Sequence, residues 1–377
     1  MKNFEVIKDS MQKREAYLSE YACKSKDAIR KEKNNEDIRL DFSRDCDRII
    51  HSSAYTRYMK KTQVFTNVDN DNISTRMTHV QFVSRASRVI ARALNLNEDL
   101  CEAIALGHDV GHTPFGHVGE HILNEISKKE LGIIFAHNLN SVRILDKIEN
   151  NGKGCNLSLQ VLDGIMSHNG EMVSKEYYPM KKDFKEFERE YNEALKDEMY
   201  IKTIRPMTLE GCVVRISDII GYIGKDIDDA VKLGILDINQ IDEDIRKRLG
   251  ENNQQIMNSI IIDIIEQSYG KPYIQMSDEV SSMVIRLKKF NSEMIYQKAN
   301  TKEDLELYSK MFNKLYEVYK KALYENDTTN DVYSCFYNKM SDSYKAKNSK
   351  EQVVIDYLSG MTDKFIIEQY EKYIEKI

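Results

Sequence analysis

The chain has few of the residues that interrupt helices. Of its 377 residues, only four are proline and 16 are glycine, and these two residues are the least tolerated inside a helix. Long helices are therefore allowed over most of the sequence. No segment shows a convincing strand-like alternation, although a short hairpin around 172–180 or 201–207 is compatible with the sequence.

Other absences restrict the class of protein. The six cysteines are scattered and form no C-x-x-C pair, which favours reduced thiols in a cytosolic protein. No stretch approaches the roughly 20 apolar residues that span a bilayer, and the first thirty residues contain no apolar signal-peptide segment. The net charge of −6 gives no general electrostatic case for nucleic-acid binding. We therefore expect a cytoplasmic protein that does not enter a membrane.

The most informative stretch runs from Ala103 to Glu120 and reads AIALGHDVGHTPFGHVGE. An apolar helical run ends in the adjacent pair His108 and Asp109, and a turn rich in glycine and proline follows before a new helix opens at His117. Because the chain leaves helical geometry at this point, both side chains of the pair can face one cavity. Mixed nitrogen and oxygen ligands of this kind suit a divalent metal ion.

A histidine on an earlier helix is a candidate for the same site. In the helix predicted over 76–94, His79 lies on the apolar stripe that also carries Val83 and Ile90. A histidine in such a position is more often a hydrogen-bonded core residue than a ligand. The combination with His108 and Asp109 is what favours a metal ligand here.

A carboxylate on a later helix completes the set. In the helix that opens at Thr208, Asp218, Tyr222 and Asp226 recur every four residues and share one face. Asp218 is flanked by valine and isoleucine, and a buried carboxylate is unfavourable unless it is paired or bound to a metal. An ion pair with Arg215 or Lys225 is the alternative. We favour the metal site, because the other three candidate ligands require an anion.

His79, His108, Asp109 and Asp218 together offer two imidazoles and two carboxylates. This donor set matches Mn²⁺, Mg²⁺, Ni²⁺ or Fe²⁺ better than structural zinc, which prefers thiolates. Four protein ligands leave about two positions of an octahedron for a water molecule and a phosphate oxygen. The sequence thus predicts a divalent metal ion as cofactor.

The order of these ligands, H…HD…D, resembles that of the HD-domain phosphohydrolases. Six ordered segments are similar to one branch, the bacterial deoxyguanosinetriphosphate triphosphohydrolase (dGTPase) family: RDCDRIIHSSAYTRYMKKTQVF, RMTHVQFV, GHDVGHTPFGHVGEH, HNLNSVRIL, SDIIGYIGKDIDDA and VVIDYLSGMTDKF. The resemblance runs from about residue 40 to about residue 370. It implies an all-α fold, an HD-domain helical bundle with additional C-terminal helices. We expect an N-terminal helical arm (1–37), an HD core (38–235) and a C-terminal helical region packed on the core (236–377).

The resemblance also assigns roles to single residues. It gives the metal to His79, His108, Asp109 and Asp218, the catalytic chemistry to His117, Glu120 and His137, and substrate binding to Gln63, Arg76, His112, Tyr222 and Asp226. The alternatives are that Glu120 only caps its helix, that His117 only packs, that Tyr222 is a core residue and that Asp226 is a surface residue paired with a lysine. Lys181, Lys182, Arg205 and Lys225 are further candidates for γ-phosphate contacts. Thr56 precedes Arg57 where family members commonly have two arginines.

The function implied is a metal-dependent dNTP triphosphohydrolase, which cleaves dGTP or other dNTPs to a deoxynucleoside and inorganic triphosphate. The expected partners are the dNTP substrate and further copies of the chain, often six in this family, with dNTP or single-stranded DNA as an effector in some members. One alternative is an HD phosphohydrolase for a monophosphate, an alarmone or a cyclic dinucleotide. Another is a nucleotide sensor without enzymatic activity.

Overall fold

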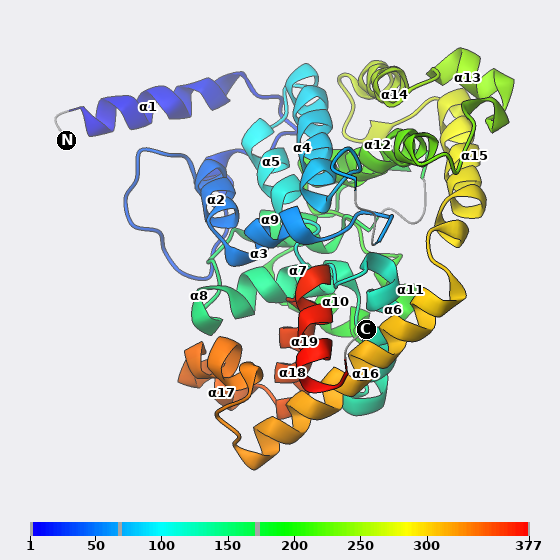
Figure 1. Ribbon diagram of the computed structural model, residues 1–377. Helices are drawn as coiled ribbons and strands as arrows, with labels where there is room; N and C mark the ends of the chain where they lie inside the picture. Colours follow the sequence, from blue (N-terminus) through cyan, green and yellow to red (C-terminus); the bar gives the residue numbers. More distant parts are fainter. Residues whose placement is uncertain (1–2, 67–69, 170–173, 376–377) are drawn as a thin grey trace.

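The computed structural model describes residues 3–66, 70–169 and 174–375, and the regular secondary structure of this part of the chain is almost entirely helical (Figure 1). Two strands of two residues each, β1 (Glu176–Tyr177) and β2 (Ile274–Gln275), pair antiparallel. The all-α prediction is confirmed. Strand β1 lies within one of the two segments considered for a hairpin, but it pairs with a segment far along the chain. Residues 172 and 173 of that segment lie outside the described residues.

The helices divide into two sequence groups. The first comprises α1 (Phe4–Arg14), α2 (Asp41–Ile50), α3 (Ser53–Arg57), α4 (Arg76–Ala93), α5 (Glu98–Gly107), α6 (Gly116–Leu131), α7 (His137–Arg143), α8 (Glu149–Gly152), α9 (Leu159–Met166), α10 (Phe184–Ala194), α11 (Glu198–Ile201) and α12 (Leu209–Lys232). The second comprises α13 (Glu243–Leu249), α14 (Asn253–Ser268), α15 (Asp278–Met294), α16 (Lys302–Glu325), α17 (Asp342–Lys347), α18 (Lys350–Ser359) and α19 (Asp363–Tyr373).

The centre of the molecule is formed by α4, α5 and α12. Helix α4 packs against both α5 and α12, α5 also contacts α2 and α9, and α12 contacts α9 and α14. Helix α12 begins where the side chain of Thr208 accepts a hydrogen bond from the backbone N–H of Gly211, an N-cap that satisfies one of the free donors of the first turn. Helix α5 is capped in the same way by Asn97. Helices α4 and α12 carry His79 and Asp218, and His108 and Asp109 directly follow α5.

The C-terminal helices pack onto the core rather than forming a separate unit. Helix α16 runs along α6, α18 and α19, and α18 also contacts α6 (Figure 1). The guanidinium of Arg143 binds both carboxylate oxygens of Asp356, at 2.6 and 2.7 Å, and thereby joins α7 to α18. Lys320 on α16 pairs with Glu130 on α6. The C-terminal region therefore shapes the same body that holds the site.

Regular helix in the predicted N-terminal arm is confined to α1, which extends away from the body in Figure 1. Residues 15–37 contain two short 3₁₀ turns, Glu15–Tyr17 and Ser25–Asp27. Arg30 then anchors this segment on α2 through Asp41 and Asp45, at 3.0 and 2.6 Å. Within the described ranges, no helix combines the length and apolar character required to cross a membrane.

A buried ion cluster ties α9, α10 and the segment before α12 together. The ammonium of Lys182 lies 2.7 Å from a carboxylate oxygen of Asp163 and 2.6 Å from one of Glu190, and it donates to the carbonyl of Arg205 at 2.6 Å. The second oxygen of Asp163 accepts from the N–H of Met207 at 2.6 Å. Burial raises the pKa of Asp163 to about 6. The lysine is thus the counter-ion of two carboxylates inside the protein.

We expect Lys182→Met to destabilise the protein by about 3–5 kcal/mol near neutral pH, because it leaves buried carboxylates without a cation. Lys182 lowers the pKa of Asp163, so its removal raises that pKa above the wild-type value of about 6. The loss should therefore narrow as the pH falls toward about 6, because the variant then gains a neutral Asp163 carboxyl at a higher pH than the wild type does. Thermal and denaturant unfolding measure both effects. Lys181→Met, at the exposed neighbouring position, is the control, and equal losses in the two variants would contradict the role of the buried cluster.

Candidate active site

A cavity of about 410 Å³ gathers the predicted site residues. It lies between the core helices and the stretch that joins α15 to α16. Ten of the twelve predicted site residues line it, namely Gln63, Arg76, His79, Asp109, His112, His117, His137, Asp218, Tyr222 and Asp226. The other two are in direct contact with lining residues: His108 lies against His79, and Glu120 binds His117 and His137. The chain therefore brings all twelve positions together.

The four predicted metal ligands converge on one point from three helices. His79 on α4 approaches Asp218 on α12 with 3.0 Å between Nε2 and Oδ1. The Nε2 atom of His108, directly after α5, lies 3.4 Å from Nε2 of His79, 3.5 Å from Oδ1 of Asp109 and 3.6 Å from Oδ1 of Asp218. Two nitrogens and carboxylate oxygens from two residues thus surround a common centre, the arrangement that a divalent ion requires.

Hydrogen bonding orients the His108 ring for this purpose. Its Nδ1 lies 2.7 Å from the carbonyl of Ala105. Because a carbonyl only accepts, Nδ1 carries the proton and Nε2 presents its lone pair to the centre, as in metal-binding histidines held by an outer partner. Burial opposes a charged ring, yet the carboxylates of Asp109 and Asp218 raise the pKa of His108 to about 9. The carboxylates thus make the centre attractive to cations.

The alternative partners of Asp218 are engaged elsewhere. Arg215 donates to the carbonyl of Ile204, and Lys225 pairs with Asp229. The contacts of Asp218 are instead with the two imidazoles, and although burial opposes its charge, they lower its pKa. The alternative ion pair with Arg215 or Lys225 is therefore not formed, and the carboxylate faces the predicted metal centre.

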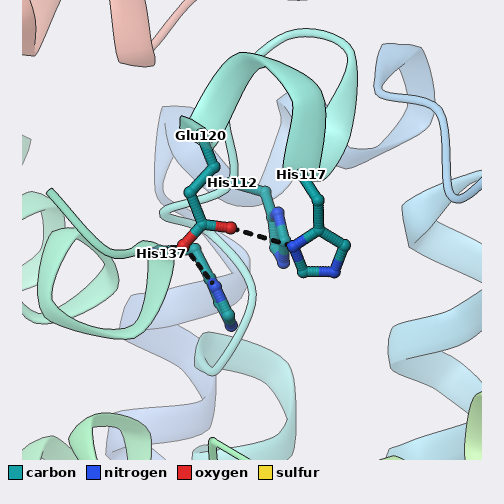
Figure 2. A group of neighbouring side chains, drawn as sticks. All are labelled: His112, His117, Glu120 and His137. Carbon is teal, nitrogen blue, oxygen red and sulfur yellow. Dashed lines mark hydrogen bonds and ion pairs between the residues drawn. The ribbon is translucent and has the colours of Figure 1, made fainter. Parts of the chain in front are cut away.

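A second cluster is organised by Glu120, one turn into α6. Figure 2 shows this carboxylate between two imidazoles, with one oxygen 2.9 Å from Nδ1 of His117 and the other 2.9 Å from Nδ1 of His137. The second oxygen also accepts from the backbone N–H of His137 at 2.7 Å. Glu120 therefore fixes the proton of each ring on Nδ1. The His117 side chain is 73% exposed, whereas His137 is buried, so His117 is the ring that a substrate can reach.

His112 and Arg76 connect the two clusters. The His112 ring stacks on His137 with centroids 4.1 Å apart, and its Nε2 lies 3.2 Å from Oδ1 of Asp109. Arg76 donates to Oδ2 of the same carboxylate at 2.7 Å. Asp109 is buried, and although burial opposes its charge, His112, His108 and Arg76 hold the pKa of this carboxyl well below its usual range. The two clusters form one continuous polar network.

His168, which is not among the twelve predicted site residues, belongs to this network. Its ring lies 4.8 Å from that of His108, and its Nε2 is 3.2 Å from Nε2 of His137. Its Nδ1 lies 2.6 Å from the carbonyl of Ile165. Burial and the neighbouring His108 and His137 lower the pKa of His168 to about 3. The sequence could have indicated His168, because buried histidines are few. Its position in the sequence does not, however, distinguish a functional-site histidine from a core histidine.

The cavity lining also contains polar groups outside the two clusters. The side-chain oxygen of Gln63 is buried and accepts no hydrogen bond from any described residue. Tyr222 lies beside His79, with ring centroids 6.5 Å apart. Asp226 is buried, accepts from the Tyr296 hydroxyl at 2.7 Å, and burial raises its pKa to about 7. Asp226 is thus not the surface residue of the alternative interpretation.

The C-terminal region supplies lining residues that sequence reasoning missed. Lys288 on α15, Tyr296 in the 3₁₀ turn Tyr296–Lys298 and Asn300 line the cavity. No motif marked them, because they lie in charged helical sequence that resembles a surface. None of the four cations considered for the γ-phosphate, Lys181, Lys182, Arg205 and Lys225, lines the cavity. Lys288 is the lysine that does.

The position at which the sequence departs from the family pattern lies away from this cavity. Thr56 is exposed and donates to the carbonyl of Ser52 at 3.4 Å. Its neighbour Arg57 lines a different cavity of about 590 Å³ between the core and the α18–α19 segment. None of the twelve predicted site residues lines that cavity. Thr56 therefore leaves the geometry of the candidate site unaltered.

Comparison with known proteins agrees with this architecture. Residues 76–222 match the model of the HD domain, and residues 274–372 match that of the phosphohydrolase-associated domain. Three relatives are each named deoxyguanosinetriphosphate triphosphohydrolase-like protein. The one from Caldanaerobacter subterraneus subsp. tengcongensis is 37% identical over 94% of this chain and 91% of its own. The relative from Desulfatibacillum aliphaticivorans is 34% identical over 97% of this chain and 97% of its own. The relative from Rickettsia bellii is 33% identical over 89% of this chain and 91% of its own.

The first match begins at Arg76 and spans the candidate metal ligands, from His79 on α4 to Asp218 on α12. The second spans the helices that close the cavity from the C-terminal side. The relatives are similar over nearly the entire chain and not over the metal motif alone. The chain therefore belongs to the family of deoxyguanosinetriphosphate triphosphohydrolase-like proteins and is an enzyme of the HD-domain phosphohydrolase type.

Proposed function

We propose that the enzyme hydrolyses deoxynucleoside triphosphates, dGTP among them, to a deoxynucleoside and inorganic triphosphate, with a divalent metal ion as cofactor. The observation that carries this proposal is the single cavity onto which three features converge. These are the His/Asp cluster around His108, the imidazole pair bound by Glu120, and the polar groups of Gln63 and Asp226. Together they match the three parts of such a substrate: phosphate, scissile bond and sugar.

The donor set fits a metal ion by its own chemistry. His79, His108, Asp109 and Asp218 would hold the ion, and the buried Nδ1 of His79 finds no hydrogen-bond partner among the described residues, which leaves that ring free to adjust. Nitrogen and oxygen ligands without thiolate favour Mn²⁺, Mg²⁺, Ni²⁺ or Fe²⁺. When bound, such an ion neutralises phosphate charge and activates a water molecule.

Residues of the chain itself then bind the phosphates and transfer the proton. Arg76 and His112 present cationic or hydrogen-bonding groups beside the cluster, where a triphosphate of roughly four negative charges would lie. Glu120 keeps the proton of His117 on Nδ1, so Nε2 is the atom that gains or loses a proton during the reaction. An exposed imidazole at the cavity rim can protonate a leaving oxygen near neutral pH. His137 is held behind it by the same carboxylate.

The polar groups of Gln63 and Asp226 support deoxyribose as the substrate sugar. The amide of Gln63 can both donate to and accept from a 3′-hydroxyl, and Asp226, which already accepts from Tyr296, can bind the same group. The ring of Tyr222 occupies the space beside them and would oppose a 2′-hydroxyl. The family resemblance extends the proposal to a cytoplasmic homo-oligomer, often hexameric, with dNTP or single-stranded DNA as effector in some members.

A panel of dNTPs and rNTPs incubated with the enzyme and Mn²⁺ tests the proposal directly. We expect deoxynucleoside and inorganic triphosphate as products of dNTPs, with rNTPs turned over poorly because of Tyr222. Separation of the products by ion-exchange chromatography distinguishes this cleavage from stepwise loss of phosphate. Release of monophosphate or diphosphate, or hydrolysis only of monophosphates, alarmones or cyclic dinucleotides, would show that the substrate is a different one.

Asp218→Ala should lose bound metal, because it removes one of two carboxylate residues from the cluster. Metal content after dialysis, measured by plasma mass spectrometry, reports this without reference to activity. Asp228→Ala is the matched control, since Asp228 lies on the same helix but does not line the cavity. Unchanged metal content in Asp218→Ala would show that this aspartate is not a ligand.

His117→Ala should keep the metal and lower kcat by about 10²–10⁴-fold, the usual contribution of a positioned acid or base. His121→Ala on the same helix is the control, because His121 is exposed and lies outside the cavity lining. Single-turnover rates with saturating dGTP and Mn²⁺ separate the chemical step from binding. Wild-type rates in His117→Ala would remove this residue from the mechanism.

A further inference from the structure

Two loops of the core meet at the cavity, and neither is held by the core alone. One is the segment 61–66, which carries Gln63 and lies between α3 and α4. The other is the turn 113–116, which leads into α6 and so places His117 and Glu120. The two loops pack closely. A Cβ atom added at Gly116 would lie only 3.7 Å from the carbonyl of Gln63 and 3.2 Å from the Arg76 guanidinium.

The second loop adopts a backbone conformation that needs support. Phe115 has φ of 59° and Gly116 has φ of 57°, so two consecutive residues lie in the left-handed region. Glycine tolerates this conformation, whereas a bulky L-residue such as phenylalanine rarely adopts it. Phe115 is also the N-cap residue of α6 and provides no side-chain cap. An external partner for its backbone would therefore help to fix where α6 begins.

One carboxylate from the C-terminal region binds both loops. Asp363, the first residue of α19, accepts through Oδ2 from the backbone N–H of Thr62 at 2.9 Å and from the hydroxyl of the same residue. Its other oxygen, Oδ1, accepts from the backbone N–H of Phe115 at 3.1 Å. Both oxygens of a single side chain are thus used, one for each loop. Hydrogen bonds to a charged acceptor are among the stronger ones in proteins.

Neighbouring contacts repeat this connection. The Tyr308 ring on α16 stacks on Phe115 with centroids 3.8 Å apart, and its hydroxyl donates to Thr66 in the first loop. Lys61, in the first loop, connects the same regions through its buried ammonium. The ammonium donates to the carbonyl of His112 and, at 3.1 Å, to the carbonyl of Ser359, four residues before Asp363. The C-terminal helices and the two loops are therefore interlocked.

We propose that Asp363 is a positioning residue of the active site, which sets the distance between the sugar-binding Gln63 loop and the turn that places His117. This inference deepens the proposed function and rests on it. Asp363 does not line the catalytic cavity and acts only through the two loops. It gives the C-terminal region a defined part in catalysis: α19 holds the two ends of the substrate site in register.

The geometry predicts a particular kinetic signature for Asp363→Asn. An amide of the same shape keeps one acceptor but turns an N–H₂ group toward N–H or O–H donors, so one loop loses its partner. Because Gln63 binds substrate and His117 acts in the reaction, we expect KM to rise and kcat to fall together. The loss of the charged hydrogen bond at one loop corresponds to a fall in kcat/KM of at least about tenfold.

Thr362→Ala is the matched control for general destabilisation. The Thr362 side chain caps the same helix by accepting from the N–H of Phe365 at 3.3 Å, and among the described residues it forms no hydrogen bond with either loop. Its removal weakens α19 but leaves the bonds of Asp363 in place. We expect Thr362→Ala to lower the unfolding temperature by as much as Asp363→Asn while its kcat and KM stay close to those of the wild type.

Hydrogen–deuterium exchange of the full-length enzyme tests the same contacts without any substrate. Peptides covering 60–66 and 113–118 should exchange faster in Asp363→Asn and Asp363→Ala than in the wild type, and should remain protected in Thr362→Ala. If the wild type hydrolyses no nucleotide, the proposed function fails, yet the exchange experiment still decides whether Asp363 holds the loops. Unchanged protection in both Asp363 variants, or kinetics equal to those of Thr362→Ala, would overturn the positioning role.

Discussion

The charge of Asp109, which is buried at the junction of all parts of the site, is the constraint on which the arrangement depends. A buried carboxylate without partners would cost several kcal/mol. Here Arg76 from α4 and His112 from the following turn bind its two oxygens, and His79 and His108 lie within 3.7 and 3.5 Å. The compensation of this one charge requires α4, α5 and the turn before α6 to be in place together, so the fold and the site form as one.

A second carboxylate, Glu120, distinguishes the two predicted catalytic histidines, His117 and His137. It binds both His117 and His137 through Nδ1, but only His117 is largely exposed. The same chemical group therefore produces a ring that can meet substrate and a ring that is held against His112 and His168. The stretch from Ala103 to Glu120 thus contributes to two distinct parts of the site, joined by the turn that Phe115 and Gly116 form.

Much of this arrangement could be predicted from the sequence because it is encoded locally. Helical spacing placed His79 on a buried face of α4 and put Asp218, Tyr222 and Asp226 on one stripe of α12, and the structure has these residues at the cavity. The contributions of Lys288, Tyr296 and His168 were not predictable in this way. They depend on which helix packs where, and their surrounding sequence is like that of many surface or core segments. Lys182 was a candidate for a phosphate contact, but the structure buries it in an ion pair with Asp163.

The sequence by itself determined the chemistry available: the HD pair, the histidine and glutamate that follow it, and the helices that carry them, because residue identity and helical period are local properties. Only the tertiary structure decided which groups share a cavity. It joined Asp218 to His79, brought Lys288 and Tyr296 beside Asp226, and placed Asp363 between two loops that lie far from it in sequence. The physical reason is that such contacts form between segments far apart in the sequence, and the burial of apolar helix faces, not local sequence, selects which segments meet.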